Sequence, residues 1–430
     1  MQGWSLEVRK MSKLEQLISK LCPNGVDYVH LWEVTVWDKR FNSVDRKKQK
    51  QIITYPYLLA SNLFNLEQPA GNVFLLSTGE KTGWTNEKLA GNYLCQGEVV
   101  AIPWGKSRPL KEVIKYYKGK FVTADNRIAT SNDTDKLLNK YLYYCMINQG
   151  ETIDKFYRGS GIKHPNMNDV LNVIIPLPPL PVQEEIVRIL DKFTELTAEL
   201  TAELTARKQQ YEYYRDDLLS KNTNKKSLKQ IALSSRSGGT PLKSNKDYYE
   251  NGTIPWLRTQ EVVFNEINKT DCFITELAVR ETSAKWIPEN CVIVAISGAS
   301  AGRCAINKIP LTTNQHCLAI EINPEVALYK YVFYCVCNQY DDLIAKKEGA
   351  RGDLNSSRIL GLEIPIPYPE DKEKSLAEQQ RIVDILDRFN KLCNDISEGL
   401  PAEIEARQKQ YEYYRDKLLS FKKKEAAENE

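Results

Sequence analysis

The sequence predicts an α+β protein with two mixed α/β domains, separated by two long antiparallel coiled-coil helices and related by a pseudo-two-fold internal repeat. Three observations lead to this prediction. A chain of 430 residues is too long for one ordinary hydrophobic core. A fifteen-residue segment occurs twice, at residues 206–220 and 406–420. Each copy follows a stretch whose apolar residues recur every three or four positions, which is typical of a helix.

The repeat is strong in the helices and weaker before them. Residues 206–220 read ARKQQYEYYRDDLLS and residues 406–420 read ARQKQYEYYRDKLLS, so twelve of fifteen positions agree. The segment QEEIVRILDKF at 183–193 matches QQRIVDILDRF at 379–389. Fainter pairs are IPLP (175–178) with IPIP (364–367), YLYYCMINQ (141–149) with YVFYCVCNQ (331–339), and FVTADN (121–126) with LTTNQ (311–315). This pattern predicts one scaffold used twice, around two domains that differ.

The repeat suggests five consecutive parts. They are an N-terminal segment (1–25), a first domain (26–179), a central helical spacer (180–221), a second domain (222–368) and a C-terminal helical spacer (369–430). We assign no role to the residues before Met11. Within the domains we expect strands at 98–102 and 291–296 and helices at 135–148 and 329–346, and hence twisted mixed sheets.

Both spacers have a narrow apolar stripe on a charged helix, for example Ile186, Leu190 and Phe193, which favours packing on one partner helix. A helix over 182–220 would be roughly 58 Å long. The second spacer contains Gly399-Leu400-Pro401, which predicts a kink or a new helix start, because proline is tolerated in a first turn.

The first spacer also contains a tandem tetrapeptide, TAEL, at 197–200 and 201–204. Four residues are close to one helical turn, so each tetrapeptide lengthens the helix by about 6 Å and roughly preserves its apolar face. The simple interpretation is an amphipathic repeat in a packed helix. The functional interpretation, which we favour, is a spacer that sets the separation of the two domains.

Composition indicates a globular protein of the cytoplasm. No apolar run is long enough to span a bilayer, and the first residues lack the apolar core of a signal peptide. The ten cysteines form no CxxC pair, so we expect reduced, buried thiols. Net charge is only +3, but seven basic residues and no acid occupy 221–246. Such a run suits phosphate contacts, although an ordinary solvated surface explains it equally well.

The sequence lacks the signatures of catalysis. The three histidines, His30, His164 and His316, are far apart and have no metal-ligand spacing, so we predict no metal site. There is no Walker loop for ATP hydrolysis. Pro178-Pro179 is flanked by leucines, whereas an amino-methyltransferase motif needs an acidic or amide residue before the prolines and an aromatic after them. We therefore expect no enzymatic activity and no catalytic residue in this chain.

The repeated helices and the segments IPLPPLPVQEE and IPIPYPEDKEKSLAEQQ that lead into them resemble the specificity subunits of type I restriction–modification enzymes. So do LCPNGV (21–26), GSGIKH (159–164), and SGGTP (237–241) followed by IPW (254–256). The resemblance extends from Met11 to the end of the chain. No single motif decides it, but the ordered, duplicated set is highly specific.

The resemblance implies a DNA-binding subunit that reads a bipartite target, one half with each target-recognition domain. It also implies partners: double-stranded DNA, two modification subunits that methylate adenine, and, through them, restriction subunits, with no membrane. No cofactor is expected in this chain, since S-adenosylmethionine, ATP and Mg²⁺ would be bound by the partner subunits.

The residues that read bases are predicted from chemistry alone, because arginine suits guanine while asparagine and glutamine suit adenine. For each candidate the alternative is an ordinary loop contact or a phosphate contact without sequence information. Trp104 and Trp256 could stack on DNA, but core packing is the simpler role. The candidates are Ser61, Asn62, Lys106, Arg108, Asn126 and Arg127 in the first domain, and Lys243, Arg258, Thr259, Gln260, Ser300, Arg303, Asn314 and Gln315 in the second.

The near-identity of the two helix ends suggests a shared task. Two docking sites for two copies of one partner would need such duplication. Mutual packing of the antiparallel helices explains it equally well, and both can hold. The docking candidates are Tyr211, Tyr213, Tyr214 and Arg215, with their copies Tyr411, Tyr413, Tyr414 and Arg415.

Two other functions remain open from the residues. The chain could be a coiled-coil adaptor that bridges protein partners without sequence-specific DNA binding. It could also be a self-sufficient methyltransferase, against which the missing motif argues. Salt-dependent DNA binding would favour a DNA reader over the adaptor. Methyl transfer by the purified chain would identify a self-sufficient methyltransferase.

Overall fold

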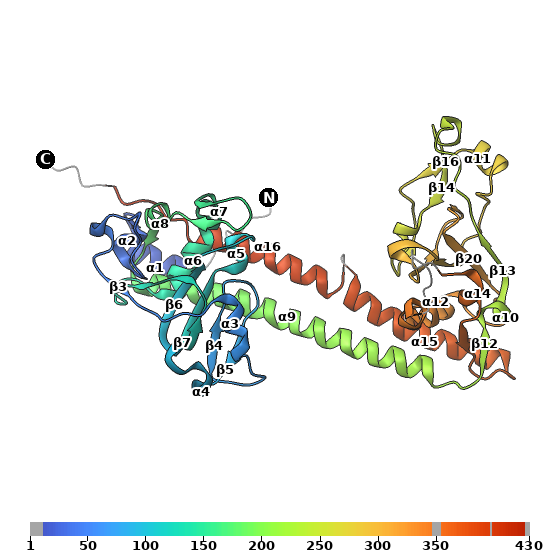
Figure 1. Cartoon of the computed structure of the whole chain (residues 1–430), viewed down its shortest axis with the longest axis horizontal. Coiled ribbons are helices and arrows are strands. Elements are labelled where there is room, and N and C mark those ends of the chain that lie inside the picture. Colours follow the sequence, from blue (N-terminus) through green and yellow to red (C-terminus); the bar gives the residue numbers. More distant parts are fainter. Residues whose placement is uncertain (1–11, 346–353, 396–397, 426–430) are drawn as a thin grey trace, which may run out of the picture. The chain divides into compact units, whose positions relative to one another are not determined.

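The computed structural model describes residues 12–345, 354–395 and 398–425, so the segment before Met11 lies outside the described residues. The chain folds into two compact units. Unit 1 is Met1–Glu199 with Ile404–Glu430, and unit 2 is Leu200–Glu403. The helix α9 (Leu180–Ser220) is unbroken, beginning in unit 1 and ending in unit 2 (Figure 1). Each unit thus combines a domain with helical segments from both spacers, and the five predicted ranges stay predictions.

Unit 1 contains a seven-stranded mixed sheet in the order β3-β2-β8-β6-β7-β4-β5. The strands of unit 1, inside and outside this sheet, are β1 (Asp27–His30), β2 (Thr35–Asp38), β3 (Ile52–Ile53), β4 (Val73–Leu76), β5 (Gly83–Thr85), β6 (Cys95–Pro103), β7 (Lys115–Thr123), β8 (Asn126–Ser131), β9 (Tyr157–Arg158), β10 (His164–Pro165) and β11 (Ile174–Leu177). Besides α9, its helices are α1 (Lys13–Leu21), α2 (Leu31–Val34), η1 (Arg46–Lys48), α3 (Ala60–Leu63), η2 (Phe64–Leu66), α4 (Glu87–Ala90), η3 (Gly91–Tyr93), α5 (Leu110–Val113), α6 (Asn139–Asn148), α7 (Gly150–Lys155) and α8 (Met167–Leu171).

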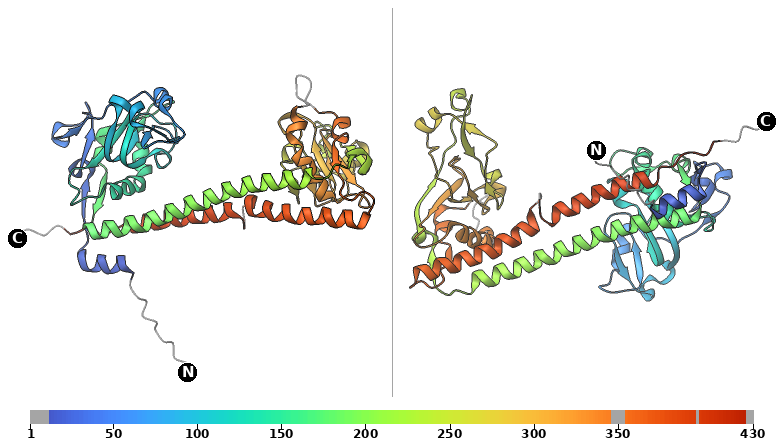
Figure 2. Two further views of the ribbon diagram at one scale, coloured as in Figure 1. Left: turned by 90° about the horizontal axis from the view of Figure 1, so that it is seen from below. Right: turned by 180° about the vertical axis from the view of Figure 1, so that it is seen from behind.

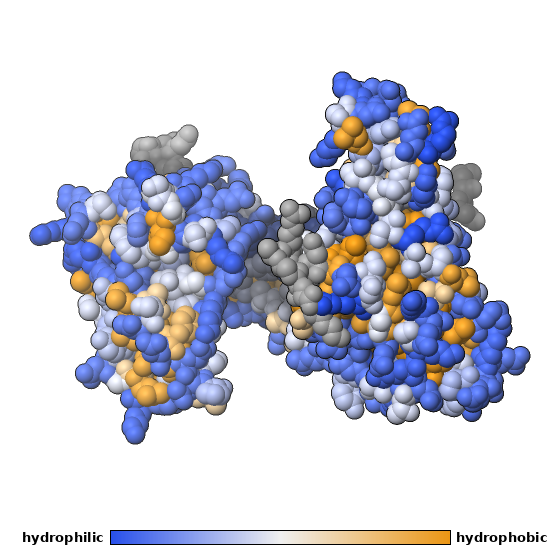
Figure 3. Space-filling model, turned by 45° about the vertical axis from the view of Figure 1, so that its right-hand side comes forward, coloured by the Kyte–Doolittle hydropathy of each residue, from blue (hydrophilic) through white to orange (hydrophobic). Residues whose placement is uncertain are grey.

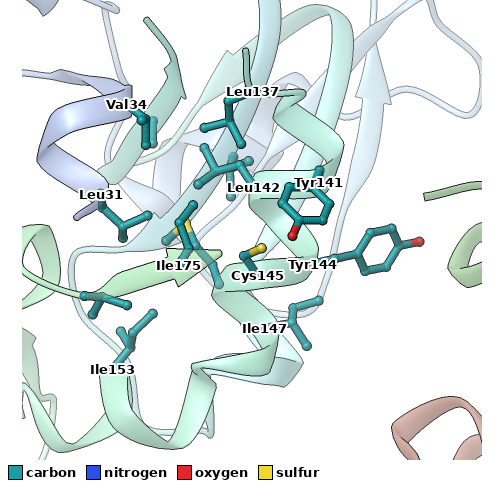
Figure 4. Packing of buried hydrophobic residues seen from close by; sticks show 14 of the residues in the cluster. Leu31, Val34, Leu137, Tyr141, Leu142, Tyr144, Cys145, Ile147, Ile153 and Ile175 are labelled. Carbon is teal, nitrogen blue, oxygen red and sulfur yellow. The ribbon is translucent and has the colours of Figure 1, made fainter. Parts of the chain in front are cut away.

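The main core of unit 1 lies between one face of this sheet and α6. Leu142 and Cys145 of α6 are buried with Leu31 of α2 and Ile175 of β11 (Figure 4). Tyr144 of α6 is buried in the same cluster, and the hydroxyl at the outer end of its ring donates to Asp191 of α9 at 2.5 Å. The helix α9 is therefore part of the core that the domain needs in order to fold.

Unit 2 repeats this plan with a smaller sheet in the order β13-β20-β17-β18-β15. The strands of unit 2, inside and outside this sheet, are β12 (Lys225–Ser227), β13 (Ala232–Ser237), β14 (Ile254–Leu257), β15 (Glu266–Ile267), β16 (Phe273–Ile274), β17 (Val292–Ala295), β18 (Cys304–Asn307), β19 (Thr312–Thr313), β20 (Cys317–Ile322) and β21 (Glu363–Pro365). Its helices are α10 (Leu228–Ile231), η4 (Lys246–Tyr248), η5 (Thr259–Glu261), α11 (Glu276–Glu281), η6 (Gly298–Ser300), α12 (Tyr329–Asn338), α13 (Tyr340–Ala345), α14 (Ser356–Leu360) and α15 (Lys372–Asn394). The last helix, α16 (Leu400–Leu418), begins in unit 2 and continues into unit 1.

The strands that lead into and out of each domain pair with each other. In unit 1, β1 is antiparallel to β11, and in unit 2, β12 is antiparallel to β21. The backbone N–H of Leu31 then donates to Val173, and that of Leu228 donates to Leu362. In each domain, therefore, the first and last strands pair with each other and form a two-stranded junction where the domain begins and ends.

A glutamine at the start of each long helix makes the same contacts in both copies. The Gln183 side chain accepts the backbone N–H of Leu138 at 3.0 Å, and the Gln379 side chain accepts that of Leu328 at 2.9 Å. Each glutamine thus satisfies an N–H at the N-terminus of α6 or α12 that no residue of those helices can accept. The match between residues 183–193 and 379–389 has this physical basis.

Tyrosines of α6 and α12 bind the long helices in the same way. Tyr144 donates to Asp191 and Tyr334 donates to Asp387, at 2.5 and 2.6 Å. The weaker repeat predicted at 141–149 and 331–339 is therefore one helix used twice. Together with the matching sheets, these contacts confirm the predicted α+β class and its internal repeat.

The repeated helix ends pack on the helix of the other copy. In unit 1, Phe193 of α9 stacks on Tyr414 of α16, with ring centroids 5.4 Å apart. In unit 2, Phe389 of α15 stacks on Tyr214 of α9 at 5.7 Å. The Cys393 side chain lies near Arg207 and Lys208, so residue numbers rise along α15 as they fall along α9. The predicted antiparallel pairing is confirmed within each unit.

The helix boundaries agree with the sequence predictions in most places. The chain begins a new helix at Leu400, with Pro401 in its first turn, as Gly399-Leu400-Pro401 predicted (Figure 2). The helix expected from 329 to 346 is two helices, α12 and α13, that meet at Gln339, and residue 346 lies outside the described residues. The helix expected from 135 begins at Asn139, because Asp133 and Gln183 bind the backbone N–H groups just before it.

The C-terminal tail of unit 1 lies against the N-terminal segment. The Val26 N–H donates to the Lys422 carbonyl at 2.9 Å, and the Tyr28 hydroxyl donates to Phe421 at 2.8 Å. Gly25 has φ +96°, and a β-carbon there would lie 2.4 Å from the Lys422 oxygen. Only glycine permits this approach, which explains the glycine of LCPNGV.

The surface is largely hydrophilic on the face seen in Figure 3, with small apolar patches. Within the described residues, no helix combines the length and apolar character that crossing a membrane would require. All ten cysteines are free and eight are buried, in keeping with their expected packing role.

Candidate nucleic-acid interface

Three loops of unit 1 meet beside the sheet. The turn between β7 and β8 is joined to the residue after β6 by a hydrogen bond from the Trp104 N–H to the Asp125 carbonyl, at 3.1 Å. The Asn126 side chain donates to the carbonyls of Leu76 and Ser77, at the end of β4. The loops after β4 and β6 and the β7–β8 turn therefore form one surface.

A half-buried lysine and a buried one hold these loops in place. The Lys115 ammonium donates to the carbonyls of Ser77 and Gly79, and burial lowers its pKa to about 8. The Lys106 side chain is 6% exposed and binds Asp154 at 2.5 Å. Both lysines position the loops and are engaged with the protein itself.

Arg127 lies at the centre of this surface. Its guanidinium stacks on the Trp104 ring at 3.9 Å and pairs with Asp125 at 2.9 Å. The same Asp125 oxygen, Oδ1, also binds the Lys39 ammonium at 2.7 Å. The Arg127 Nε is buried and has no hydrogen-bond partner within the described residues. The guanidinium is thus fixed in orientation with unused donor capacity.

The structure separates the first-domain candidates by exposure. Lys106, Asn126 and Arg127 are buried, and the contacts above engage them within the protein. Arg108 is exposed and pairs with Glu80 and Glu112. Ser61 and Asn62 are exposed on α3, whose Leu63 packs with Ala124 of the β7–β8 turn. All six therefore lie on or beside the three loops, but only Ser61, Asn62 and Arg108 are open to solvent.

The carboxyl group of Asp38 lies beneath this surface, 2% exposed, and accepts the Ile128 N–H at 2.6 Å. Burial raises its pKa to about 6, against the lowering effect of the Ile128 hydrogen bond and of Lys39 and Arg127. Because the folded state holds this proton more tightly than the unfolded state, the Asp38 contribution to stability falls as pH rises from about 4 to 6.

We expect Asp38→Asn to stabilise unit 1 at pH 8 by up to about 3 kcal/mol, since asparagine can accept the same N–H without carrying a buried charge. The difference between variant and wild type should shrink as pH falls towards 5. Urea unfolding across this pH range measures it. A difference that does not change with pH would contradict a buried charge at Asp38.

Four loops of unit 2 meet in the same manner. The Gly239 N–H donates to the Thr313 carbonyl, and the Asn314 N–H donates to the Leu257 carbonyl, at 2.9 and 3.0 Å. A β-carbon on Gly238 would lie 1.8 Å from the Thr313 oxygen, so this approach requires glycine. The helix η5 lies against η6. The loops after β13, β14 and β17 and the turn before β20 therefore form one surface.

The second-domain candidates all lie on these loops. Asn314 is 9% exposed, and its side chain accepts the His316 N–H. Arg258 is half-buried near Glu261 and Asp271, and its buried Nε makes no hydrogen bond within the described residues but lies 3.6 Å from a Glu261 carboxylate oxygen. Thr240 donates to the exposed Gln315, which bonds in turn to His316. The remaining candidates are exposed or half-exposed: Lys243, Thr259, Gln260, Ser300 and Arg303.

Sequence reasoning missed one cluster in unit 1. The loop after β2, residues 39–50, has six basic residues (Lys39, Arg40, Arg46, Lys47, Lys48 and Lys50) and one acid, Asp45. This is a denser charge run than the 221–246 segment, and a count of charge along the sequence was enough to find it. What only the structure adds is its connection to Asp125, through Lys39.

The repeated helix ends divide into packed and exposed residues. Tyr211 and Tyr411 are half-buried against the two cores, and Tyr214 and Tyr414 stack on Phe389 and Phe193. Arg215 and Arg415 each lie over the tyrosine four residues before them and pair with the aspartate that follows. Tyr213 and Tyr413 are 68% and 60% exposed. Mutual packing thus explains most of the repeat, but it does not explain these two tyrosines.

Each surface presents exposed amide, hydroxyl and guanidinium groups on loops that buried residues hold in place. Such groups can bind base edges and phosphates. Within the described ranges, no group of His, Cys, Asp and Glu side chains is arranged to hold a metal ion. The surfaces of the two units share their supporting framework and differ in the residues exposed.

Comparison with known proteins assigns the family. The family model described as "Type I restriction modification DNA specificity domain" matches the chain twice, at residues 42–207 and 220–406. The chain belongs to this family. The specificity family relatives include the Escherichia coli type I restriction enzyme EcoR124I/EcoR124II specificity subunit, 36% identical over 436 residues, covering 98% of this chain and 100% of that protein. The Haemophilus influenzae putative specificity subunit S.HindORF215P is 32% identical over 349 residues, covering 76% and 84%.

Solved structures agree on the fold. The type I restriction–modification S subunit from M. genitalium has a TM-score of 0.55 at 16% identity, covering 92% of this chain and 96% of that one. A chain from a type I complex studied for its assembly has a TM-score of 0.52 at 15% identity, covering 92% and 98%. The chain is thus a type I specificity subunit, which recognises a DNA sequence within a restriction–modification complex, and the adaptor function is not favoured.

Proposed function

We propose that this chain reads a bipartite DNA target without catalysis of its own, one half with the loops of each unit. The observation that carries the proposal is the contrast between scaffold and loops. Gln183 and Gln379 make the same contacts in both units, whereas the exposed loop residues, such as Arg108 and Gln260, have no common pattern. Two different readers on one repeated support suit a target with two unlike halves.

The exposed and half-exposed side chains of these loops are the proposed base readers: Ser61, Asn62 and Arg108 in unit 1, and Lys243, Arg258, Thr259, Gln260, Ser300, Arg303 and Gln315 in unit 2. The buried candidates Lys106, Asn126, Arg127 and Asn314 would position the loops. Arg127 and Arg258 differ from the others because each has a buried Nε that makes no hydrogen bond within the described residues, so only their terminal guanidinium nitrogens could bind a base or phosphate.

The proposed partners supply the chemistry. Two identical modification subunits would dock on the repeated helix ends, one around Tyr213 and the other around Tyr413, and restriction subunits would join through them. S-adenosylmethionine, ATP and Mg²⁺ would be bound by those subunits, in the cytoplasm. The duplication of the exposed tyrosines supports two docking sites, because two copies of one partner need the same surface twice.

Methylation mapping tests this proposal. Cells that express this chain with the modification subunit of its own system should gain methyladenine in one interrupted two-part motif. The control omits this chain and should gain none. A second arm carries Gln260→Ala and Gln315→Ala, which should relax one half of the motif and leave the other unchanged.

Two outcomes would contradict the proposal. One is a soluble, associated complex that leaves no new methyladenine, which would favour a protein adaptor. The other is methyl transfer by the purified chain alone, which would make the chain itself an enzyme.

A further inference from the structure

The loop after β2 in unit 1 presents cations that the protein itself does not use. Of its six basic side chains, Lys39 pairs with Asp125, Arg40 donates to the Gln49 carbonyl and Lys48 donates to Asn172. Arg46, Lys47 and Lys50 have neither an ion pair nor a side-chain hydrogen bond within residues 12–345, 354–395 and 398–425. The single acid, Asp45, accepts the backbone N–H of Lys47 at 2.8 Å.

The loop is held rigidly despite its charge. Gln49 is 3% exposed, and its side chain accepts the Phe41 N–H at 3.0 Å and donates to the Lys39 carbonyl at 3.2 Å. Phe41 and Val44 are buried in the main core of unit 1. The backbone is therefore ordered before any ligand binds, which lowers the entropic cost of binding.

The loop forms one wall of a cleft of about 450 Å³. Lys47, Lys48, Lys50 and Lys136 line it, together with Trp32 and Asn132. Two carboxylates also line it, and both have partners in the protein, one of them the cleft lysine Lys136. Glu33 accepts the His30 N–H, and Asp133 pairs with Lys136. We call the side chains of Lys47, Lys48, Lys50 and Lys136 with their hollow the basic cleft.

We propose that the basic cleft binds the phosphodiester backbone of duplex DNA next to the half-site read by unit 1. This inference rests on the proposed function and adds a contact that carries no sequence information. Unpaired cations on a rigid loop suit phosphates, whose contacts position a protein on DNA. The loop is linked to the recognition surface at its first residue, Lys39, which binds Asp125 of the β7–β8 turn, and the cleft is lined by the later residues of the same loop.

Salt dependence of binding tests the basic cleft. The full chain, assembled with its modification subunit, is titrated with a target duplex and with a duplex lacking the target, at several salt concentrations. The variant is Lys47→Gln with Lys50→Gln. The control is Lys20→Gln with Lys88→Gln, two exposed lysines of unit 1 on α1 and α4.

Removing one lysine–phosphate interaction should lower the slope of log affinity against log salt by about 0.9. The cleft variant should therefore have a slope smaller by about 2 on both duplexes, with an unchanged ratio of target to non-target affinity. The control should retain the wild-type slope. This result would support phosphate binding in the cleft, because only an interaction without sequence information weakens both duplexes equally.

Three outcomes would overturn the inference. They are a wild-type slope in the cleft variant, a loss of affinity confined to the target duplex, and a loss of assembly with the modification subunit at unchanged DNA binding. The last would mean that the cleft binds an acidic protein segment instead. Failure of the wild-type complex to prefer the target would count against the proposed function, which distinguishes the two failures.

Discussion

A complex of the modification subunits with a chain that lacks residues 201–204, one TAEL tetrapeptide, should methylate a target whose halves stand one or two base pairs closer together. The helix α9 is continuous from unit 1 into unit 2, so a deletion within it acts on both units. Removing four residues shortens the helix by about 6 Å, whereas one base pair rises 3.4 Å. Methylation of the original target should fall by at least about 100-fold, because only one half can then be bound in register.

The deletion should leave the fold of both units intact. Four residues are close to one turn, so the apolar stripe continues across the join with a rotation of only about 40°. The Phe193–Tyr414 and Phe389–Tyr214 stacks lie on either side of the deleted segment and retain their partners within each unit.

Methylation mapping of the deletion variant measures the new gap, and the two half-sites should remain readable. A matched control, Thr201→Ala, keeps the length of the helix and should keep the original gap. A third TAEL inserted after Leu204 should widen the gap instead. If the deletion variant still methylates the original target, α9 does not set the spacing.

The double variant Tyr213→Ala, Tyr413→Ala should weaken assembly with the modification subunits while leaving the free chain as stable as wild type. Both rings are more than half exposed, so their removal costs the folded chain little. A tyrosine at the centre of an interface contributes about 2 kcal/mol or more, roughly 30-fold in affinity. With one tyrosine at each docking site, the doubly loaded complex should be weakened by about 30-fold at each site.

Size-exclusion chromatography with the modification subunit measures the assembly, and thermal unfolding measures the stability. Each single variant should still bind one modification subunit at the intact site. The matched control is Tyr214→Ala with Tyr414→Ala, which removes the stacks on Phe389 and Phe193 and should lower the unfolding temperature. Wild-type assembly of the first pair would show that the repeated helix ends serve packing alone.

The loops show how much of the site could be predicted from the sequence. Chemistry alone selected Arg127 and Asn126 as base readers, and the loops on which they lie do meet. However, Asn126 binds Leu76 and Thr123 inside the domain, and Arg127 stacks on Trp104. Neither neighbour could be predicted, because the contacts join residues up to 50 positions apart in a sheet of mixed strand order. The basic loop at 39–50 was visible in the sequence, but only the structure shows that it is linked to the β7–β8 turn, through the pair between Lys39 and Asp125.

By itself the sequence determined the repeat, the helix pair and the family, because each depends on local periodicity or on identity between two segments. The apolar spacing before Tyr211 and Tyr411 requires helices, and Leu400-Pro401 requires a new helix start. The tertiary structure alone decided which of the repeated residues are used in packing and which are left exposed. It half-buries Tyr211 and stacks Tyr214 on Phe389, yet leaves Tyr213 exposed. The reason is geometric: a helix facing one partner buries only the residues on that side, and the partner's position follows from long-range packing that no local pattern records.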